Sequence, residues 1–152
     1  MDNEEIISTL NDLIVCFKEG EEGLKACAED LEKLNPDLKS VLLERQRACS
    51  IAVYELQNLV RAQGGAPESG GSISGALHRA WVNIKTAIRG TDDETVLTEC
   101  ERYVDLALKL YAGVLEQDLP AHIGLVVERQ YQAVLRDYEQ IKALREQVEV
   151  QA

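Results

Sequence analysis

Residues 64–90 read GGAPESGGSISGALHRAWVNIKTAIRG, and this stretch decides how the rest of the chain is arranged. Its first part, residues 64–72, holds four of the ten glycines together with Pro67, a composition typical of a loop. Its second part places apolar residues on one helical face, and Ser74 can cap that helix, so we predict a short helix over residues 74–89. The residues of that face are Leu77, Ala80, Trp81, Ile84 and Ile88.

Apolar residues recur with a helical period on both sides of this stretch, and no segment shows the sustained alternation of a strand. Pro36 and Pro120 suit the first turns of helices, and Thr91 with Glu94 has capping-box spacing. Four long helices are therefore predicted, each about 40 Å long. Their ranges are 4–32, 36–63, 92–117 and 120–147.

Long helices of matched length with short first and last connections predict a four-helix bundle. The long middle connection lets the second and third helices run parallel, and one such crossover is typical of ferritin-like bundles. The predicted fold is all-α: a single ferritin-like four-helix-bundle domain over residues 1–152, with a long crossover that carries a short fifth helix. A chain of 152 residues is long enough to bury one sizeable core.

Composition limits the partners that the protein can have. Apolar residues make up 45% and charged residues 28%, which is typical of a soluble globular protein. The net charge of −11 would repel phosphates, so we expect neither nucleic acid nor a membrane as a partner. The first ten residues contain no basic stretch of a secretory signal, and we expect a cytoplasmic location.

The four cysteines form no CxxC pair and fall within apolar helical patterns. We interpret them as small buried residues in a reducing compartment rather than as redox or metal ligands. They are Cys16, Cys27, Cys49 and Cys100.

Three acids, Glu21, Glu55 and Glu101, lie at or near core-facing positions of the first three long helices. Di-iron bundles use a Glu from each of two helices and a Glu-x-x-His from each of the others, because positions i and i+3 share a helix face. The only histidines are His78 and His122, and neither follows a Glu by three positions. An oxygen-only set would suit Mn, Mg or Ca better than a redox iron pair.

The alternative interpretation is that arginines neutralise these acids, and we favour it over metal binding. Arg45 falls on the inward side of the second segment, and Arg102 is next to Glu101. A further hypothesis concerns the basic face of the predicted short helix, which is either ordinary solvated surface or a docking face for an acidic partner. That face consists of Arg79, Lys85 and Arg89.

Several motifs together carry a family resemblance. They are Asn11-Asp12-Leu13-Ile14, Gly20, Gly23, Glu55-Leu56-Gln57, Gly64-Gly65-x-Pro67, Gly71-Ser72, Gly75-x-Leu77-His78-Arg79-x-Trp81, Glu99-Cys100-Glu101-Arg102, Leu119-Pro120 and Leu144-Arg145. With these motifs nearly the whole chain resembles a bacterial ferritin-like four-helix-bundle family of unknown function. The resemblance implies a ferritin-like fold and a cytoplasmic location, without an established activity.

The chain departs from that family's pattern at two points. Where members often read Glu-Arg-Gly-Glu-Asp, this chain has Val104 in place of the second Glu. Where members often carry His-Asp late in the fourth helix, this chain has Tyr138-Glu139. If relatives bind metal in the core, the resemblance implies that this chain has weakened or lost that site.

The sequence thus predicts a non-enzymatic ferritin-like protein without a cofactor, acting as a stress-associated or interaction module and self-associating as a dimer. The alternative is a di-metal protein that holds Fe or Mn through Glu21, Glu55 and Glu101.

Overall fold

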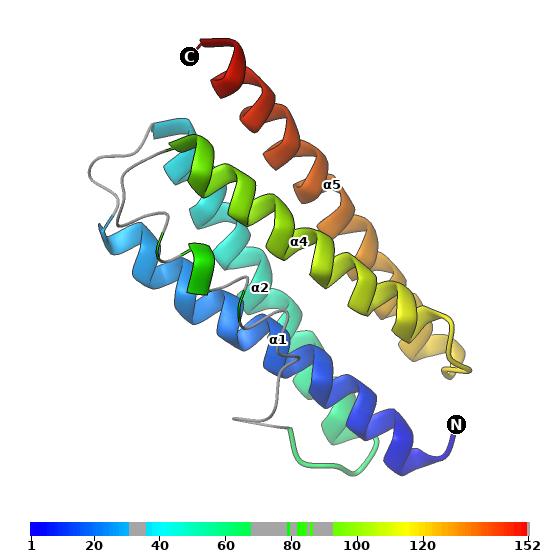
Figure 1. Ribbon diagram of the computed structural model, residues 1–152. Coiled ribbons are helices and arrows are strands. Elements are labelled where there is room, and N and C mark those ends of the chain that lie inside the picture. Colours follow the sequence, from blue (N-terminus) through cyan, green and yellow to red (C-terminus); the bar gives the residue numbers. More distant parts are fainter. Residues whose placement is uncertain (31–35, 68–78, 80–81, 85, 87–92, 152) are drawn as a thin grey trace.

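The computed structural model describes residues 1–30, 36–67, 79, 82–84, 86 and 93–151, and within them it contains four long helices and no strand (Figure 1). The all-α prediction is confirmed, and the predicted helix ends agree with the observed ones to within a few residues. The helices are α1 (Asn3–Asp30), α2 (Pro36–Ala62), α4 (Asp93–Leu115) and α5 (Ala121–Gln151).

The predicted short helix at residues 74–89 falls largely outside the described residues. Residues 79, 82–84 and 86 have helical backbone conformation, and Ile84 is buried as expected for its predicted face. The other residues of that face, Leu77, Ala80, Trp81 and Ile88, lie outside the described part of the chain.

The helix ends follow from local sequence. At the start of α1 the Glu5 amide donates to Asp2 Oδ1 at 2.8 Å and the Asp2 amide donates to Glu5 Oε2 at 3.1 Å, a reciprocal cap. After α2, Gly64 adopts a φ of 83°, which a glycine reaches without strain. The Gly65 amide then donates to the Val60 carbonyl at 3.0 Å, which ends the helix in a Schellman motif.

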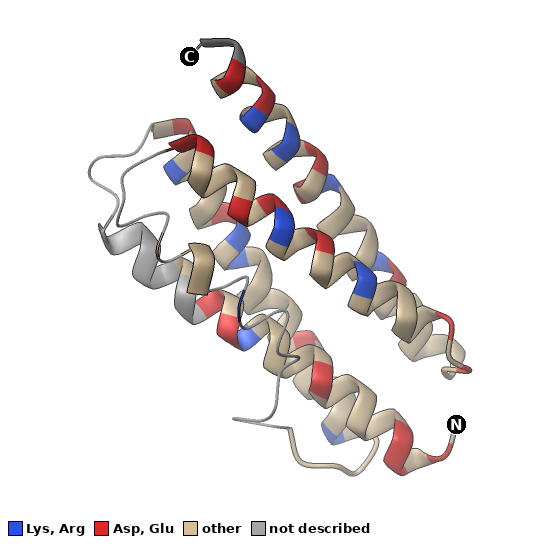
Figure 2. Ribbon diagram, in the orientation of Figure 1, with Lys and Arg blue, Asp and Glu red and all other residues tan. Residues whose placement is uncertain are grey.

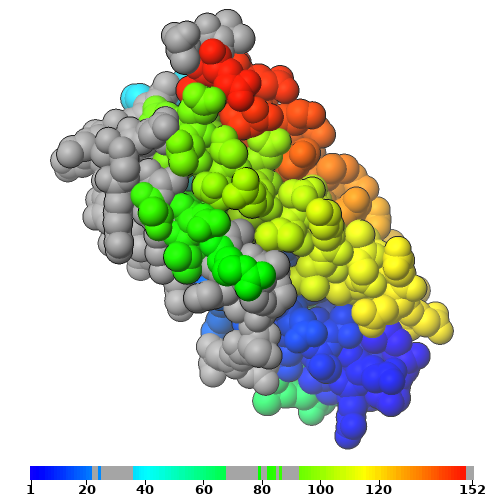
Figure 3. Space-filling view, viewed as in Figure 1, coloured from blue at the N-terminus to red at the C-terminus, as the bar shows by residue number. Residues whose placement is uncertain are grey.

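Two antiparallel hairpins build the bundle (Figure 1). Helix α1 packs on α2 and α4 packs on α5, while α2 also contacts α5 and α1 contacts α4. Helices α2 and α4 run in the same direction, so the end of α2 and the start of α4 lie at opposite ends of the bundle. The start of α1 (blue) meets the end of α4 (yellow), as Figure 3 shows, and Thr9 Oγ1 donates to Gln117 Oε1 there at 3.3 Å.

The core lies along the axis between the four helices, and all four contribute buried apolar residues at spacings of three or four positions. Charged residues occur along all four helices (Figure 2), and Arg45 is the one described charged residue that is buried. On α4 the buried positions are Val96, Leu97, Cys100, Tyr103, Val104, Ala107, Leu108, Tyr111 and Val114. Three predicted buried thiols, Cys16, Cys49 and Cys100, are confirmed as buried and free, while the side chain of Cys27 lies outside the description.

None of the helices in the described part of the chain combines the length and the apolar character that a membrane crossing requires.

Candidate functional site

Among the residues whose side chains the structure describes, the apolar core contains one buried cation, Arg45 on α2, whose exposed fraction is only 6%. Its Nη1 donates to Asp137 Oδ2 on α5 at 2.6 Å. The guanidinium carbon also lies 5.9 Å from the centre of the Phe17 ring, within the range of a cation–π contact. Among the residues that the structure describes, the Nε of Arg45 has no hydrogen-bond partner.

Arg45 stays protonated despite its burial. Burial acts to lower the pKa of Arg45, but Cys49 and Asp137 act in the opposite direction, and the net pKa is raised. Burial also raises the pKa of the Cys16 thiol to about 12 and raises the pKa of Cys49. Both thiols are therefore neutral near physiological pH and unsuited to nucleophilic chemistry.

A second polar contact crosses the core between α4 and α1. The Tyr103 hydroxyl donates to the backbone carbonyl of Cys16 at 3.0 Å. A Cβ at Gly20 would lie 2.7 Å from that hydroxyl oxygen, so only glycine at this position lets the phenol reach the backbone of α1. Burial raises the pKa of Tyr103 well above its usual range.

Gln130 on α5 joins three helices through its amide. Its Oε1 accepts a hydrogen bond from the Tyr111 hydroxyl of α4 at 2.9 Å. Its Nε2 donates to the Ala52 carbonyl on α2 at 3.4 Å and lies 3.5 Å from Glu55 Oε1. Only 5% of Gln130 is exposed. Burying its amide without these hydrogen bonds would lower the stability of the fold.

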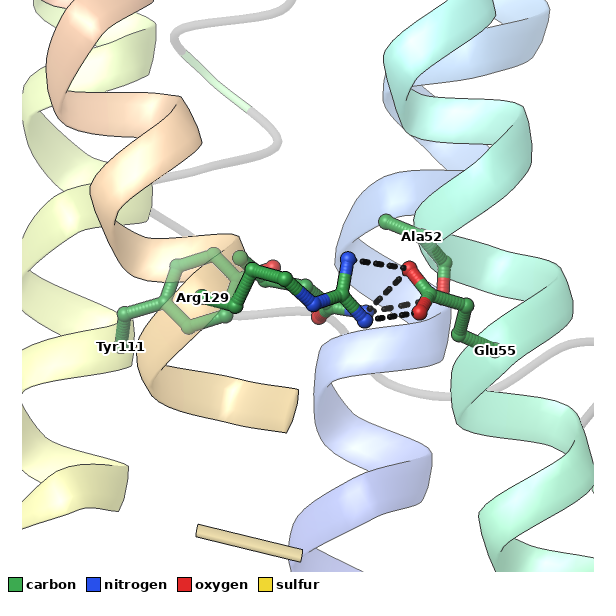
Figure 4. Close-up of polar contacts among 5 residues, drawn as sticks. Ala52, Glu55, Tyr111 and Arg129 are labelled. Carbon is green, nitrogen blue, oxygen red and sulfur yellow. Dashed lines mark hydrogen bonds and ion pairs between the residues drawn. The ribbon is translucent and has the colours of Figure 1, made fainter. Parts of the chain in front are cut away.

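Glu55, one of the three predicted metal ligands, pairs with an arginine. Arg129 extends from α5 towards Glu55 on α2, beside Ala52 (Figure 4). Arg129 Nη1 donates to Glu55 Oε1 at 3.3 Å, and Nη2 donates to Oε2, so the contact is bidentate. The Glu55 side chain is 26% exposed.

Glu101, the second predicted ligand, also pairs with an arginine of α5. Arg145 Nε donates to Glu101 Oε2, and Arg145 Nη1 donates to Glu149 at 2.7 Å. The sequence-based pairing of Arg102 with Glu101 was wrong, because Arg102 lies one position further around α4 and pairs with Glu99 at 3.0 Å.

Arg45 was correctly placed on the inward side of α2, but its partner is Asp137 and none of the three predicted ligands. Sequence reasoning did not identify Asp137 as the partner of Arg45. Asp137 stands three positions after Val134 and four before Ile141, both buried, and this spacing is the signal that places its carboxylate towards the core.

The structure does not bring Glu55 and Glu101 together. Their partners Arg129 and Arg145 stand sixteen positions apart on α5. At a rise of about 1.5 Å per residue, that places them about 24 Å apart along the helix. Ions in two-metal sites are only about 4 Å apart.

The third predicted ligand, Glu21, is half-buried on α1, near enough to Cys49 for its charge to help raise that thiol's pKa. Among the residues described here, no group of three or more His, Cys, Asp or Glu side chains gathers as a metal ion would need. Metal binding by Glu21, Glu55 and Glu101 stays a prediction.

The remaining predicted polar residues lie at the surface or outside the description. His122 is exposed at the start of α5, and His78 lies outside the described residues. Arg79 of the predicted basic face is exposed, while Lys85 and Arg89 lie outside the description. The described polar groups thus consist mainly of arginine–carboxylate pairs beside neutral thiols and phenols.

Comparisons with known proteins place the chain in a family. A search of curated proteins found no match. Residues 5–117 match the domain of unknown function DUF2383. This range begins two residues inside α1, includes α2 and ends two residues past the end of α4. Helix α5, which supplies Asp137, Arg129 and Arg145, follows it. Because the match covers most of the chain, the protein belongs to the DUF2383 family, whose domain has no known function.

Proposed function

We propose that this protein is a non-catalytic ferritin-like bundle that acts in the cytoplasm by binding other molecules, and that arginines occupy the role that metal ions have in di-metal bundles. The observation that carries the proposal is the pairing of inward carboxylates with arginines of α5. Glu55 pairs with Arg129, and Glu101 pairs with Arg145. A ferritin-like arrangement is supported by the parallel direction of α2 and α4 in Figure 1.

The buried cation at Arg45 supports the same conclusion. A guanidinium inside the bundle is a permanent positive charge, since arginine does not lose its proton in proteins. It would repel a divalent ion held nearby in a medium of low dielectric constant. The donor set also lacks a Glu-x-x-His pair, so the described residues fit a network of arginine–carboxylate pairs better than a di-iron centre.

The test is elemental analysis of protein purified from cells supplied with iron and manganese, and of the same protein incubated with each ion and dialysed. We expect far less than one ion per chain, both for the wild type and for Glu55→Ala. The matched control is Glu128→Ala, an exposed glutamate of α5. A stoichiometric ion that Glu55→Ala loses and Glu128→Ala keeps would overturn the proposal in favour of the di-metal alternative.

We also propose that the protein self-associates as a dimer. Support comes from large apolar side chains that α2 leaves exposed, because Ile51 is 56% and Tyr54 is 65% exposed. Sedimentation equilibrium should give twice the mass of one chain, and Tyr54→Glu should shift the protein towards monomer. A wild-type mass of 16.9 kDa at all concentrations would contradict self-association.

A further inference from the structure

A cleft of about 270 Å³ opens between α2 and α5 and reaches into the core. Small residues face each other across it, Ala48 and Ala52 on α2 and Ala133 on α5, which keeps the space between the helices free. The rings of Phe17 and Tyr111 line its inner end. Figure 4 shows this region, with Arg129 and Glu55 bridging the two helices beside Ala52.

The cleft is cationic in an acidic protein. Three arginines line it, Arg45, Arg129 and Arg136, and the carboxylates of Asp137 and Glu55 pair with the first two, which leaves an excess of one positive charge. The whole chain carries a net charge of −11, so this local excess of positive charge is opposite to the charge of the molecule. Clefts with walls of low dielectric constant concentrate such a field on ions of opposite charge.

Two of these arginines have N–H groups available for hydrogen bonds to a ligand. Arg45 gives one nitrogen to Asp137, but its buried Nε has no partner among the described residues. Arg136 is exposed, and no ion pair within the described part of the chain involves it. On α5 it follows Arg129 by seven positions and Ala133 by three, a spacing that keeps all three on one helix face.

Apart from Gln130 and the Tyr111 hydroxyl, which are hydrogen-bonded to each other, the other lining residues are apolar, among them Phe17, Ile51 and Val134. A ligand that matches this lining has an apolar body as well as a negative charge. The volume of about 270 Å³ lies just below the roughly 300–1,000 Å³ typical of ligand pockets, so the ligand is small. A single charge fits better than two, because Glu55 remains in the cleft and an apolar wall does not solvate a second charge.

We propose that the cleft between α2 and α5 binds a small monocarboxylate with an aromatic or branched apolar body, its carboxylate held by the arginines and its body against Phe17 and Val134. Arginine suits this role because its planar donors match a carboxylate in a bidentate manner. The inference rests on the proposed function, because it requires Glu55 to pair with Arg129 and not to bind a metal ion.

The first experiment is isothermal titration calorimetry of the full chain with three probes: sodium benzoate, benzyl alcohol and inorganic phosphate. We expect benzoate to bind with a dissociation constant below about 1 mM, and the other two at least about tenfold more weakly. Equal binding of benzyl alcohol would show simple apolar partition, and equal binding of phosphate would show an unspecific anion site. Either result, or the absence of benzoate binding, overturns the inference.

Two variants locate the binding without touching the buried ion pair. Ala133→Leu fills the cleft and Arg136→Gln removes a charge at its mouth, and each should weaken benzoate binding at least about tenfold. The matched controls are Ala143→Leu on the exposed side of α5 and Arg47→Gln on the exposed side of α2, which should bind as the wild type does. Equal effects of Ala133→Leu and Ala143→Leu would overturn the assignment to this cleft.

A nuclear magnetic resonance titration gives a second readout. Benzoate should shift the side-chain Nε–H signal of Arg45, and benzyl alcohol should leave it in place. An unchanged signal at saturating benzoate overturns the role given to Arg45. Metal content measured on the same samples separates the two proposals. A metal ion bound at Glu55 contradicts the proposed function, whereas a metal-free protein that does not bind benzoate contradicts this inference alone.

Discussion

Replacing Asp137 with alanine tests the central ion pair, because it leaves the Arg45 guanidinium buried without its carboxylate. Removing one partner of a fully buried pair costs about 3–5 kcal/mol, whereas an exposed pair contributes only about 0.2–1 kcal/mol. The Arg45 side chain is 7% exposed and that of Asp137 is 28% exposed, so the pair lies between these limits. We expect Asp137→Ala to lower the free energy of unfolding by about 2–3 kcal/mol.

The assay is equilibrium unfolding in guanidinium chloride followed by far-UV circular dichroism, supported by thermal melts. For a chain of this size the loss corresponds to a fall in Tm of about 5–10 °C. Asp105→Ala is the matched control, since Asp105 pairs with Lys109 at the surface with both side chains largely exposed, and its loss should be below about 0.5 kcal/mol.

A double variant, Arg45→Met with Asp137→Leu, removes both charges and should recover much of the stability lost in Asp137→Ala, because apolar residues can replace a buried pair. Equal stability of Asp137→Ala and Asp105→Ala would refute the reasoning. It would mean that solvent or another carboxylate satisfies the guanidinium.

Three further perturbations follow from the same network. Gly20→Ala should destabilise the protein by about 1 kcal/mol or more, because the new Cβ would displace the Tyr103 hydroxyl, and this outweighs the higher helix propensity of alanine. In urea unfolding, adding Tyr103→Phe to Gly20→Ala should restore most of the lost stability. Burial raises the pKa of Cys16 to about 12 and also raises that of Cys49, so the stability from keeping them neutral is fully present below about pH 9 and is lost as the pH rises towards 12. The free energy of unfolding of Cys16→Ala should therefore fall less steeply than that of the wild type as the pH rises through this window. A slope equal to that of the wild type would refute the raised pKa of Cys16. Arg129→Gln should cost less than about 1 kcal/mol, and the loss should shrink in 1 M salt, since this arginine is largely exposed.

Much of the fold could be predicted from the sequence because its signals are local. Apolar spacings of three and four positions placed the four long helices, and Pro36 and Pro120 marked the starts of α2 and α5. The length of the middle connection indicated that α2 and α4 run parallel, as Figure 1 shows. Arg45 was placed inward for the same reason, since it shares its face with the buried Leu38, Leu42 and Cys49.

The pairing of side chains across helices could not be predicted in this way. The contact of Glu55 with Arg129 depends on how far α2 is shifted along α5, and no local pattern fixes that shift. Arg129 and Arg145 stand at exposed or half-buried positions of α5 and look like solvated charges in the sequence. The cleft likewise depends on Ala48 and Ala133 facing each other from helices that are distant in sequence.

The most direct test of the account is a crystal structure of the protein grown with Mn²⁺, with anomalous scattering measured at the manganese edge. We expect Arg129 within hydrogen-bond distance of Glu55, Arg145 within hydrogen-bond distance of Glu101, and no anomalous peak inside the bundle. A peak coordinated by Glu55 or Glu101, with its arginine turned away, would contradict the claim that these carboxylates are neutralised by arginine.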